Sequence, residues 1–313
     1  MNSTLKIAVD CGKAYTKTAY RSEAGVVVTS SFETRFNPNP SERDFLSTGT
    51  DSVEVDGKRY AVGPTSVVRA SGNTSKAEEI HHVLTMYAVA KICKETGAKE
   101  VDLAVGCPLS EISTKEARKA YKKFIAPVGP AYVKINGETL SIRINSVTVC
   151  PESFGAVTLN GERFEDDIVG VIDIGGLNIN ACMFKNLVAM PDTMFTADFG
   201  YNVLRSKVKE ALMEEYGMDN IMDDLVDQYI EKGHMKNKED SDEIIKACIH
   251  SHFVSILKEC KKRGWDMNGV SLVCVGGSSL FFKRALEQKY PDVYIPEDAQ
   301  YCNVKGFLAS IDN

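Results

Sequence analysis

Residues 9–12 read VDCG and residues 172–175 read IDIG, and about half of the 313-residue chain separates these two stretches. In each of them an aspartate follows an apolar, strand-like run, and a glycine lies two positions after the aspartate. The next segments, 16–20 and 179–184, are again strand-like, so both stretches predict a β-hairpin. In dinucleotide-binding folds and Walker loops the glycines open a helix instead. The pattern therefore argues against both of those folds.

The two hairpins suggest an anion site with a metal ion. Glycine lets backbone amides approach an anion closely, since no Cβ intervenes, so two such loops could grip a polyphosphate from both sides. Asp10 and Asp173 repel a bare polyphosphate, and they make sense if Mg²⁺, held through its waters, lies between carboxylates and phosphates. Lys17, seven residues after Asp10, is expected to point back toward the loop and add a positive charge.

Composition limits the classes of protein that the chain can belong to. With 43% hydrophobic residues, 26% charged residues and a net charge of −6, the chain has the composition of a globular protein, and its length permits two domains. The mild acidity argues against direct nucleic-acid binding, although a local basic patch would survive that average. No apolar run is long enough to cross a bilayer, and the N-terminus leads straight into a strand, so we expect neither a signal peptide nor a membrane partner. The nine scattered cysteines predict reduced core thiols in a cytoplasmic protein.

The helix signals are clear in the first half of the chain. A long helix is expected over 76–96, with Ser75 and Glu78 as its capping box and Gly97 at its end. Ser113, with a glutamate three residues later, is expected to cap a second helix that runs through residue 124.

Turn and loop signals complete an α/β order throughout the chain. Asp-Gly at 56–57 and Asn-Gly at 136–137 predict tight hairpin turns. The charged stretch 232–242 is expected to be a solvated loop between helices, and 303–311 a short closing helix. Residues 276–278 (GGS) lie between a strand and a helix, where a nucleoside could lie against bare backbone, although such glycines also serve helix packing.

Taken in order, five pieces of the sequence form a recognisable set: Asp10-x-Gly12 with Lys17, the triplet 151–153 (PES), Asp173-x-Gly175-Gly176, the triplet 276–278 and residues 303–307 (NVKGF). This set resembles the actin-like ATPases, and most closely the bacterial plasmid-segregation actins of the ParM (StbA) type. The resemblance covers essentially the whole chain.

The resemblance implies an α/β, actin-like fold of two RNase H-like domains with a nucleotide cleft between them. Domain I would comprise residues 1–157, with 303–313 packing back on it, and domain II residues 158–302. The implied activity is ATP hydrolysis with Mg²⁺, coupled to polymerisation into homopolymeric filaments. Such filaments would segregate plasmid DNA through a DNA-bound partition adaptor of the ParR type.

The resemblance also assigns roles to individual residues. Glu152 matches the glutamate that positions the hydrolytic water, and Asp10 and Asp173 match the aspartates beside Mg²⁺; an acid at a helix N-terminus would be another explanation of Glu152. Gly200 resembles the glycine near the sugar, and Lys207, Lys209 and Glu210 are candidates for the adenosine pocket, although a solvated helix face explains them nearly as well. The full nucleotide-binding set is Gly12, Lys13, Lys17, Gly175, Gly176, Leu177, Asn178, Gly200, Lys207, Glu210, Gly276, Gly277 and Ser278.

Two departures and two alternatives stay open. Leu177-Asn178 and residues 13–16 (KAYT) stand where relatives often have smaller polar residues, which leaves the choice between ATP and GTP undecided. A sugar or carboxylate kinase of the same superfamily would need an acceptor pocket and a general base. Another cytoskeletal actin, such as a cell-shape filament, would normally add an amphipathic terminal helix. Filament contacts are expected on surface segments such as 37–52 or 232–242.

Overall fold

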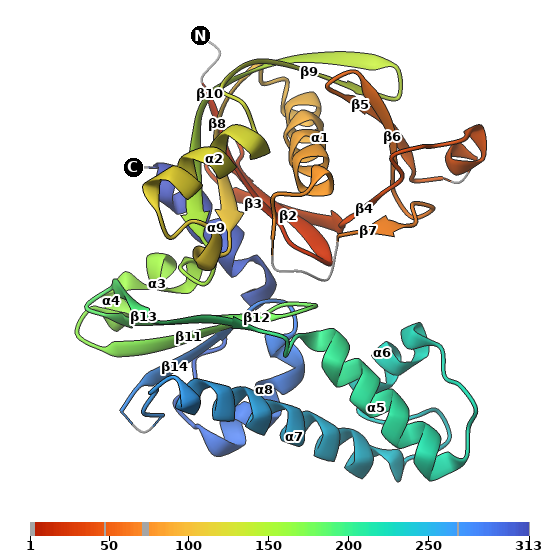
Figure 1. The fold of residues 1–313 in the computed structure, drawn as a ribbon, viewed down its shortest axis with the longest axis vertical. Coiled ribbons are helices and arrows are strands. Elements are labelled where there is room, and N and C mark those ends of the chain that lie inside the picture. The colour runs from red at the N-terminus through yellow and green to blue at the C-terminus, as the bar shows by residue number, and fades with distance from the viewer. Residues whose placement is uncertain (1–3, 47, 71–74, 268, 313) are drawn as a thin grey trace. The chain divides into compact units, whose positions relative to one another are not determined.

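The computed structural model describes residues 4–46, 48–70, 75–267 and 269–312. The chain divides into two compact units. Unit 1 is Met1–Leu159 with Tyr301–Asn313, and unit 2 is Asn160–Gln300. Both units combine helices with a β-sheet (Figure 1), so the α/β class is confirmed.

Unit 1 is built on an eight-stranded sheet in the order β3-β2-β1-β8-β10-β9-β5-β6. Strands β1, β2 and β3 form an antiparallel meander, whereas β1, β8 and β10 run parallel to one another. The strands are β1 (Leu5–Cys11), β2 (Tyr15–Arg21), β3 (Val27–Glu33), β5 (Asp51–Val55), β6 (Lys58–Val62), β8 (Glu100–Cys107), β9 (Gly129–Ile135) and β10 (Glu138–Pro151), and a separate pair joins β4 (Arg35–Phe36) to β7 (Val68–Arg69).

The sheet of unit 1 curls around helix α1 (Glu79–Thr96), as Figure 1 shows. Buried side chains therefore occur on every face of α1, which is typical of a helix enclosed by other elements. On the opposite face of the sheet, Val304, Phe307 and Leu308 of α9 (Cys302–Asp312) pack against small residues that include Ala8 and Ala104. The predicted closing helix is thus confirmed. Helices α2 (Lys115–Ile125) and α3 (Gly155–Leu159) complete unit 1.

The expected start of the first long helix is wrong. Helix α1 begins at Glu79, and Glu78 occupies the N-cap position without a side-chain capping bond. Ser75 donates instead from its hydroxyl to Glu111 Oε2 (3.3 Å), and the backbone N–H of Lys76 donates to the same oxygen (3.2 Å). These tertiary contacts hold the segment in a non-helical conformation, so the local capping signal does not decide the boundary. The predicted end at Gly97, with φ of 73°, is confirmed.

The cap of the second helix is also one residue away from its predicted place. Thr114, and not Ser113, is the N-cap of α2, and its Oγ1 accepts a hydrogen bond from the N–H of Ala117 (3.1 Å). Substitution of Thr114 by alanine should therefore lower the free energy of unfolding by about 1 kcal/mol. Urea unfolding would measure this loss. Ser113→Ala, at the neighbouring exposed position, serves as the matched control and should change little; equal losses in the two variants would contradict the assignment.

The hairpin turns at 56–57 and 136–137 are confirmed, because both residues of each turn have positive φ. A further hairpin turns at 186–187, where an asparagine and a leucine both have positive φ. Leucine rarely occupies this backbone region, so turn chemistry gave no signal there.

Unit 2 contains a four-stranded sheet in the order β13-β12-β11-β14. Helix α6 ends at Lys232 and α7 begins at Ser241, which confirms the expected break between helices. The elements are α4 (Gly161–Phe164), β11 (Ile168–Ile174), β12 (Ile179–Lys185), β13 (Val188–Ala197), α5 (Tyr201–Tyr216), α6 (Asp223–Lys232), α7 (Ser241–Lys262), β14 (Ser271–Val275) and α8 (Ser279–Lys289).

The two units repeat one topology. The order β3-β2-β1-β8 in unit 1 has the same strand directions as β13-β12-β11-β14 in unit 2, with an antiparallel meander followed by a parallel strand. The equivalence extends to the register, because Asp10 lies opposite Lys17 and Asp173 lies opposite Asn180. The repeated hairpin predicted from the sequence is confirmed, and it marks the first two strands of each unit.

Two further features agree with the composition. The nine cysteines are free, and eight of them are buried. Within the described ranges, no helix combines the length and apolar character that a bilayer crossing requires.

Candidate functional site

The two Asp-x-Gly loops are closed by the same hydrogen bond. The N–H of Gly12 donates to Tyr15 O (3.1 Å), and the N–H of Gly175 donates to Asn178 O (3.0 Å). A Cβ on Gly12 would lie 2.8 Å from that Tyr15 oxygen, and one on Gly175 would lie 3.0 Å from the Asn178 oxygen. A side chain would thus clash with the turn at Gly12 and would fit at Gly175 only if the turn shifted slightly.

The first loop lies at an edge of the sheet where a second carboxylate also lies. Asp10 belongs to β1, and Glu152 directly follows β10, so both occupy carboxyl ends of parallel strands, which meet at one edge. The N–H of Glu152 donates to Cys107 O at the end of β8 (3.0 Å). Asp10 is 4% exposed and Glu152 is 7% exposed. Glu152 is in a turn before α3, so a position in the first turn of a helix does not explain it.

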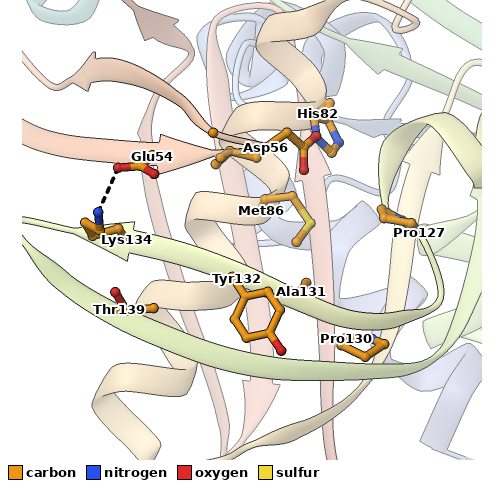
Figure 2. A pocket seen from close by; sticks show the side chains of 12 residues that line it. Glu54, Asp56, His82, Met86, Pro127, Pro130, Ala131, Tyr132, Lys134 and Thr139 are labelled. Atoms are coloured by element: carbon orange, nitrogen blue, oxygen red, sulfur yellow. Dashed lines mark hydrogen bonds and ion pairs between the residues drawn. The ribbon is translucent and has the colours of Figure 1, made fainter.

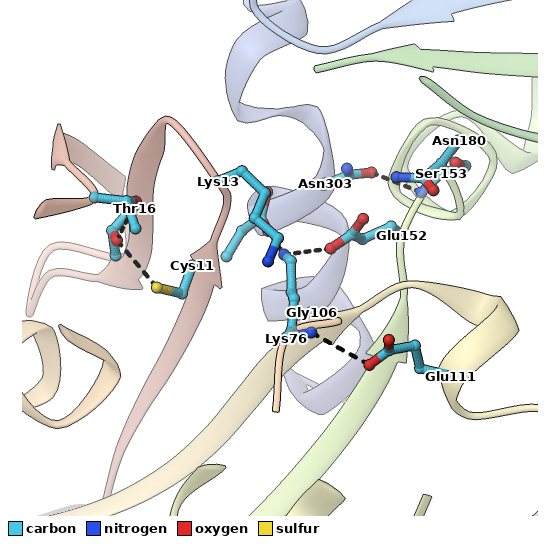
Figure 3. A network of polar contacts seen from close by, with 12 residues as sticks. Cys11, Lys13, Thr16, Lys76, Gly106, Glu111, Glu152, Ser153, Asn180 and Asn303 are labelled. Carbon is cyan, nitrogen blue, oxygen red and sulfur yellow. Dashed lines mark hydrogen bonds and ion pairs between the residues drawn. The ribbon is translucent and has the colours of Figure 1, made fainter. Parts of the chain in front are cut away.

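Lys76, which no sequence motif marks, joins these two carboxylates. Its side chain, on a residue that is 3% exposed, places Nζ 3.2 Å from Asp10 Oδ1 and in an ion pair with Glu152 Oε1. Figure 3 shows Lys76 and Glu152 pointing toward each other. No local pattern could have identified Lys76, because Asp10 is 66 residues away along the chain.

The charges in this cluster support one another. Burial alone would raise the pKa of Asp10, but the positive charges of Lys76 and Lys17 outweigh it and lower the pKa below its usual value. Burial alone would lower the pKa of Lys76, but Glu152 and Asp10 outweigh it and raise the pKa well above its usual value. Asp10 and Lys76 are therefore both ionised at neutral pH.

The two lysines of the first hairpin have different surroundings. Lys17 lies opposite Asp10 in the β1–β2 pair, which agrees with the expectation that it faces the loop. Lys13 places Nζ 2.6 Å from Glu78 Oε1 and also donates to Ser75 O. The side chain of Lys13 thus connects the loop to the segment before α1. The predicted contact of Lys13 with a nucleotide would therefore come from its backbone.

Two more residues shape the edge that carries Asp10 and Glu152. A Cβ on Gly106 of β8 would lie 3.2 Å from Asp10 Oδ1 and 2.6 Å from Phe307 Cε2, so only glycine fits between them. Asn303 of α9 accepts a hydrogen bond at Oδ1 from the N–H of Ser153 (3.2 Å) and so fixes the turn after Glu152 (Figure 3). Gly106 was missed because it lies inside an ordinary strand pattern.

In unit 2 the second loop is joined to the start of α5. The carbonyls of Gly175 and Gly176 accept hydrogen bonds from the first two N–H groups of α5, at 3.0 and 2.8 Å. Gly200, the N-cap residue of α5, donates to Leu177 O (3.1 Å), and a Cβ at this position would overlap the Leu177 backbone. Gly200 therefore lies against the loop, as its membership of the predicted set requires.

The third glycine segment also meets the second loop. Ser278 Oγ donates to Gly175 O (3.2 Å). Gly276 has φ of 85°, and a Cβ there would overlap the carboxylate of Asp173, which is 7% exposed. Gly276 stands beside Asp173 as Gly106 stands beside Asp10, each at the end of the strand parallel to the aspartate-bearing one. The structure thus brings together three predicted segments, 175–178, 200 and 276–278.

The adenosine-pocket candidates lie further along α5. Lys207 is half-buried, Glu210 is exposed, and Lys209 pairs with Asp223 (3.0 Å). The role of Lys207 and Glu210 stays a prediction.

A separate pocket of about 290 Å³ lies in unit 1 (Figure 2). Met86 and Tyr132 contribute to its lining, as does His82, whose Nε2 contacts Asp56 Oδ2 at 3.0 Å. None of its lining residues belongs to the loops or to the carboxylate cluster. We therefore do not assign this pocket to the site.

Known proteins place this arrangement in a class. Residues 8–155 match the family model described as "Actin like proteins N terminal domain". The chain as a whole has the actin-like fold.

Three solved structures illustrate the likeness. The archaeal actin homolog Ta0583 is 20% identical, with a TM-score of 0.76, and the match covers 99% of each chain. The Alp12 filament structure is 25% identical, with a TM-score of 0.71, over 99% of this chain and 98% of that one. Bacillus thuringiensis ParM with ATP is 16% identical, with a TM-score of 0.71, again over 99% and 98%. The resemblance to actin-like proteins is confirmed. No curated protein matches the chain in sequence.

Proposed function

We propose that the chain is an actin-like ATPase that binds ATP with Mg²⁺ and assembles into filaments of its own kind. The observation that carries this proposal is the buried aspartate beside a glycine-closed hairpin in both units, Asp10 and Asp173, together with buried Glu152. Similar structures described as a filament or as containing ATP support it. The plasmid-segregation role rests on the resemblance in sequence order.

The residues suit a magnesium ion that keeps most of its waters. Within the described part of the chain, no group of three or more His, Cys, Asp or Glu residues could hold a metal ion by itself. Mg²⁺ is commonly bound through one or two carboxylates, waters and substrate phosphates, so one aspartate per loop fits this ion. Asp10 and Asp173 would hold it, and when bound it would neutralise part of the phosphate charge.

The protein's own groups would perform the remaining work. Backbone amides of the hairpins would contact phosphate oxygens, and Lys17 would add positive charge. Gly276 and Gly277 would let the nucleoside lie on backbone at the start of α8. Glu152 would accept a hydrogen bond from a water and orient it toward the γ-phosphate, since phosphoryl transfer depends mostly on positioning and electrostatics.

Light scattering and phosphate release, recorded in parallel after addition of Mg-ATP, test the proposal. We expect scattering to rise above a critical concentration and phosphate release to follow it. A parallel run with Mg-GTP shows which nucleotide is preferred, and a run with ATP and EDTA shows whether a metal ion is required. Scattering that stays flat over a wide range of protein concentrations would contradict filament assembly. Phosphorylated product, found when a set of sugars is supplied with Mg-ATP, would support the kinase alternative.

Glu152→Gln should slow phosphate release by roughly 100-fold, because the amide cannot polarise a water as the carboxylate does. Assembly should persist, since nucleotide binding does not require this carboxylate, and the filaments should be longer-lived. Glu54→Gln, which breaks a half-exposed pair with Lys134, is the matched control and should leave the rate unchanged. Normal phosphate release from Glu152→Gln would remove this residue from the mechanism.

We propose that contact with DNA is indirect and runs through a DNA-bound adaptor of the ParR type. The net charge of −6 and the resemblance support this assignment. Filter binding of plasmid DNA at low and moderate salt should show no retention by the protein alone, and salt-resistant retention would contradict the proposal.

A further inference from the structure

A lysine stands between the two acidic groups of unit 1. Lys76 precedes α1, Asp10 lies in β1 one residue before its end, and Glu152 follows β10, so three separate segments meet at one ammonium group. We infer that Lys76 is a positioning residue that holds Glu152 in its working orientation, an inference that rests on the proposed hydrolysis.

Contacts on both sides of the chain hold the backbone of Lys76 in place and so position its ammonium group. The N–H of Lys76 donates to Glu111 Oε2 (3.2 Å), on the segment that follows β8 (Figure 3). On the other side, Lys13 binds Ser75 and Glu78, the neighbours of Lys76 in the chain. Lys76 is therefore fixed both to the first glycine loop and to the sheet edge that carries Glu152.

Electrostatics explains why a cation is needed at this place. Asp10 and Glu152 are buried, and two buried carboxylates close to one cation would repel each other strongly if that cation were removed. A single ammonium group that contacts both carboxylates removes this repulsion and restricts the rotation of the Glu152 side chain. Lys17, opposite Asp10, adds positive charge on the Asp10 side.

If Lys76 acts through Glu152, the effects of substituting the two residues are coupled, and a double-mutant cycle measures this coupling. Lys76→Met should lower kcat for phosphate release by roughly 100-fold, because Glu152 loses the contact that orients it. The KM for Mg-ATP should change much less, since Lys17 still supplies positive charge beside Asp10. In a Glu152→Gln background the same substitution should add little further loss. Lys76→Arg should recover part of the rate, since the positive charge is kept.

A lysine outside the cluster serves as the matched control. Lys58→Met removes an exposed lysine that pairs with Glu79 of α1 (3.0 Å), and it should leave kcat unchanged. If the losses from Lys76→Met and Glu152→Gln multiply in the double variant, the two residues act independently and the inference is overturned. Full activity of Lys76→Met overturns it equally. If Lys76→Met does not fold, Lys76→Gln, which keeps a hydrogen-bond donor without the charge, takes its place in the cycle.

Urea unfolding of the same four proteins separates this inference from the proposed function. A wild-type protein that releases no phosphate would defeat the proposed ATPase. The unfolding free energies would still show whether Lys76 and Glu152 are coupled, because a real ion pair makes the two single losses non-additive. Strictly additive losses would overturn the inference whether or not the protein hydrolyses ATP.

Discussion

Asp173→Asn is expected to lower Mg-ATP hydrolysis by at least roughly 100-fold, since the negative charge that attracts the metal–nucleotide complex to the second loop is lost. Asparagine has nearly the same shape as aspartate, so unit 2 should stay folded. Asp173 is buried at the end of β11, beside Gly276 of the third glycine segment. Phosphate release and equilibrium binding of a fluorescent ATP analogue, each with and without Mg²⁺, measure the two parts of this effect.

Asp192→Asn supplies the control for this prediction. Asp192 is an exposed aspartate on β13 of the same unit, and its loss of charge should leave both binding and hydrolysis unchanged. An unaltered rate in Asp173→Asn would exclude Asp173 from nucleotide use. Loss of binding that is equal with and without Mg²⁺ would show that Asp173 acts on the fold of the loop and not through the metal.

Gly306→Val should destabilise unit 1 by more than about 3 kcal/mol. Helices α3 and α9 cross at Gly155 and Gly306, and a Cβ on Gly306 would overlap the Gly155 backbone, which cannot move aside as a flexible side chain can. Phosphate release should fall as well, because Asn303 of the same helix holds the turn that carries Glu152. Urea unfolding and phosphate release measure the two losses.

Ala309→Val introduces the same β-branched residue into the same helix at a half-buried position, and it should change stability by only a few tenths of a kcal/mol. Similar unfolding midpoints for Gly306→Val and Ala309→Val would show that the helix crossing tolerates a side chain.

The parts of the fold that could be predicted are those whose signal is local. A strand, an aspartate, a glycine and a second strand occupy a single short segment, residues 5–21 or 168–185, and both such hairpins form where the sequence places them. The segment before α1 shows the limit of local signals. Ser75 and Glu78 satisfy a capping pattern, but contacts with Glu111 and Lys13, far away in the chain, decide the backbone there.

The candidate site follows the same rule. Glu152 could be found because it belongs to an ordered set of motifs, whereas Lys76 carries no motif and acquires its role only when three distant segments meet. Gly106 was missed for a related reason. A side chain at this position would collide with Phe307, on the closing helix, and would crowd Asp10, on another strand.

The hydrogen bonds between the second loop and α5 have a mechanical consequence. Because the Gly175 and Gly176 carbonyls bind the first N–H groups of a 16-residue helix, the shape of the loop and the direction of that helix cannot change independently. Tyr201, in the first turn, donates its hydroxyl to Asp227 of α6 (2.8 Å). The first residue of α5 therefore connects the second loop directly to α6, so a change in the loop would be transmitted to both helices.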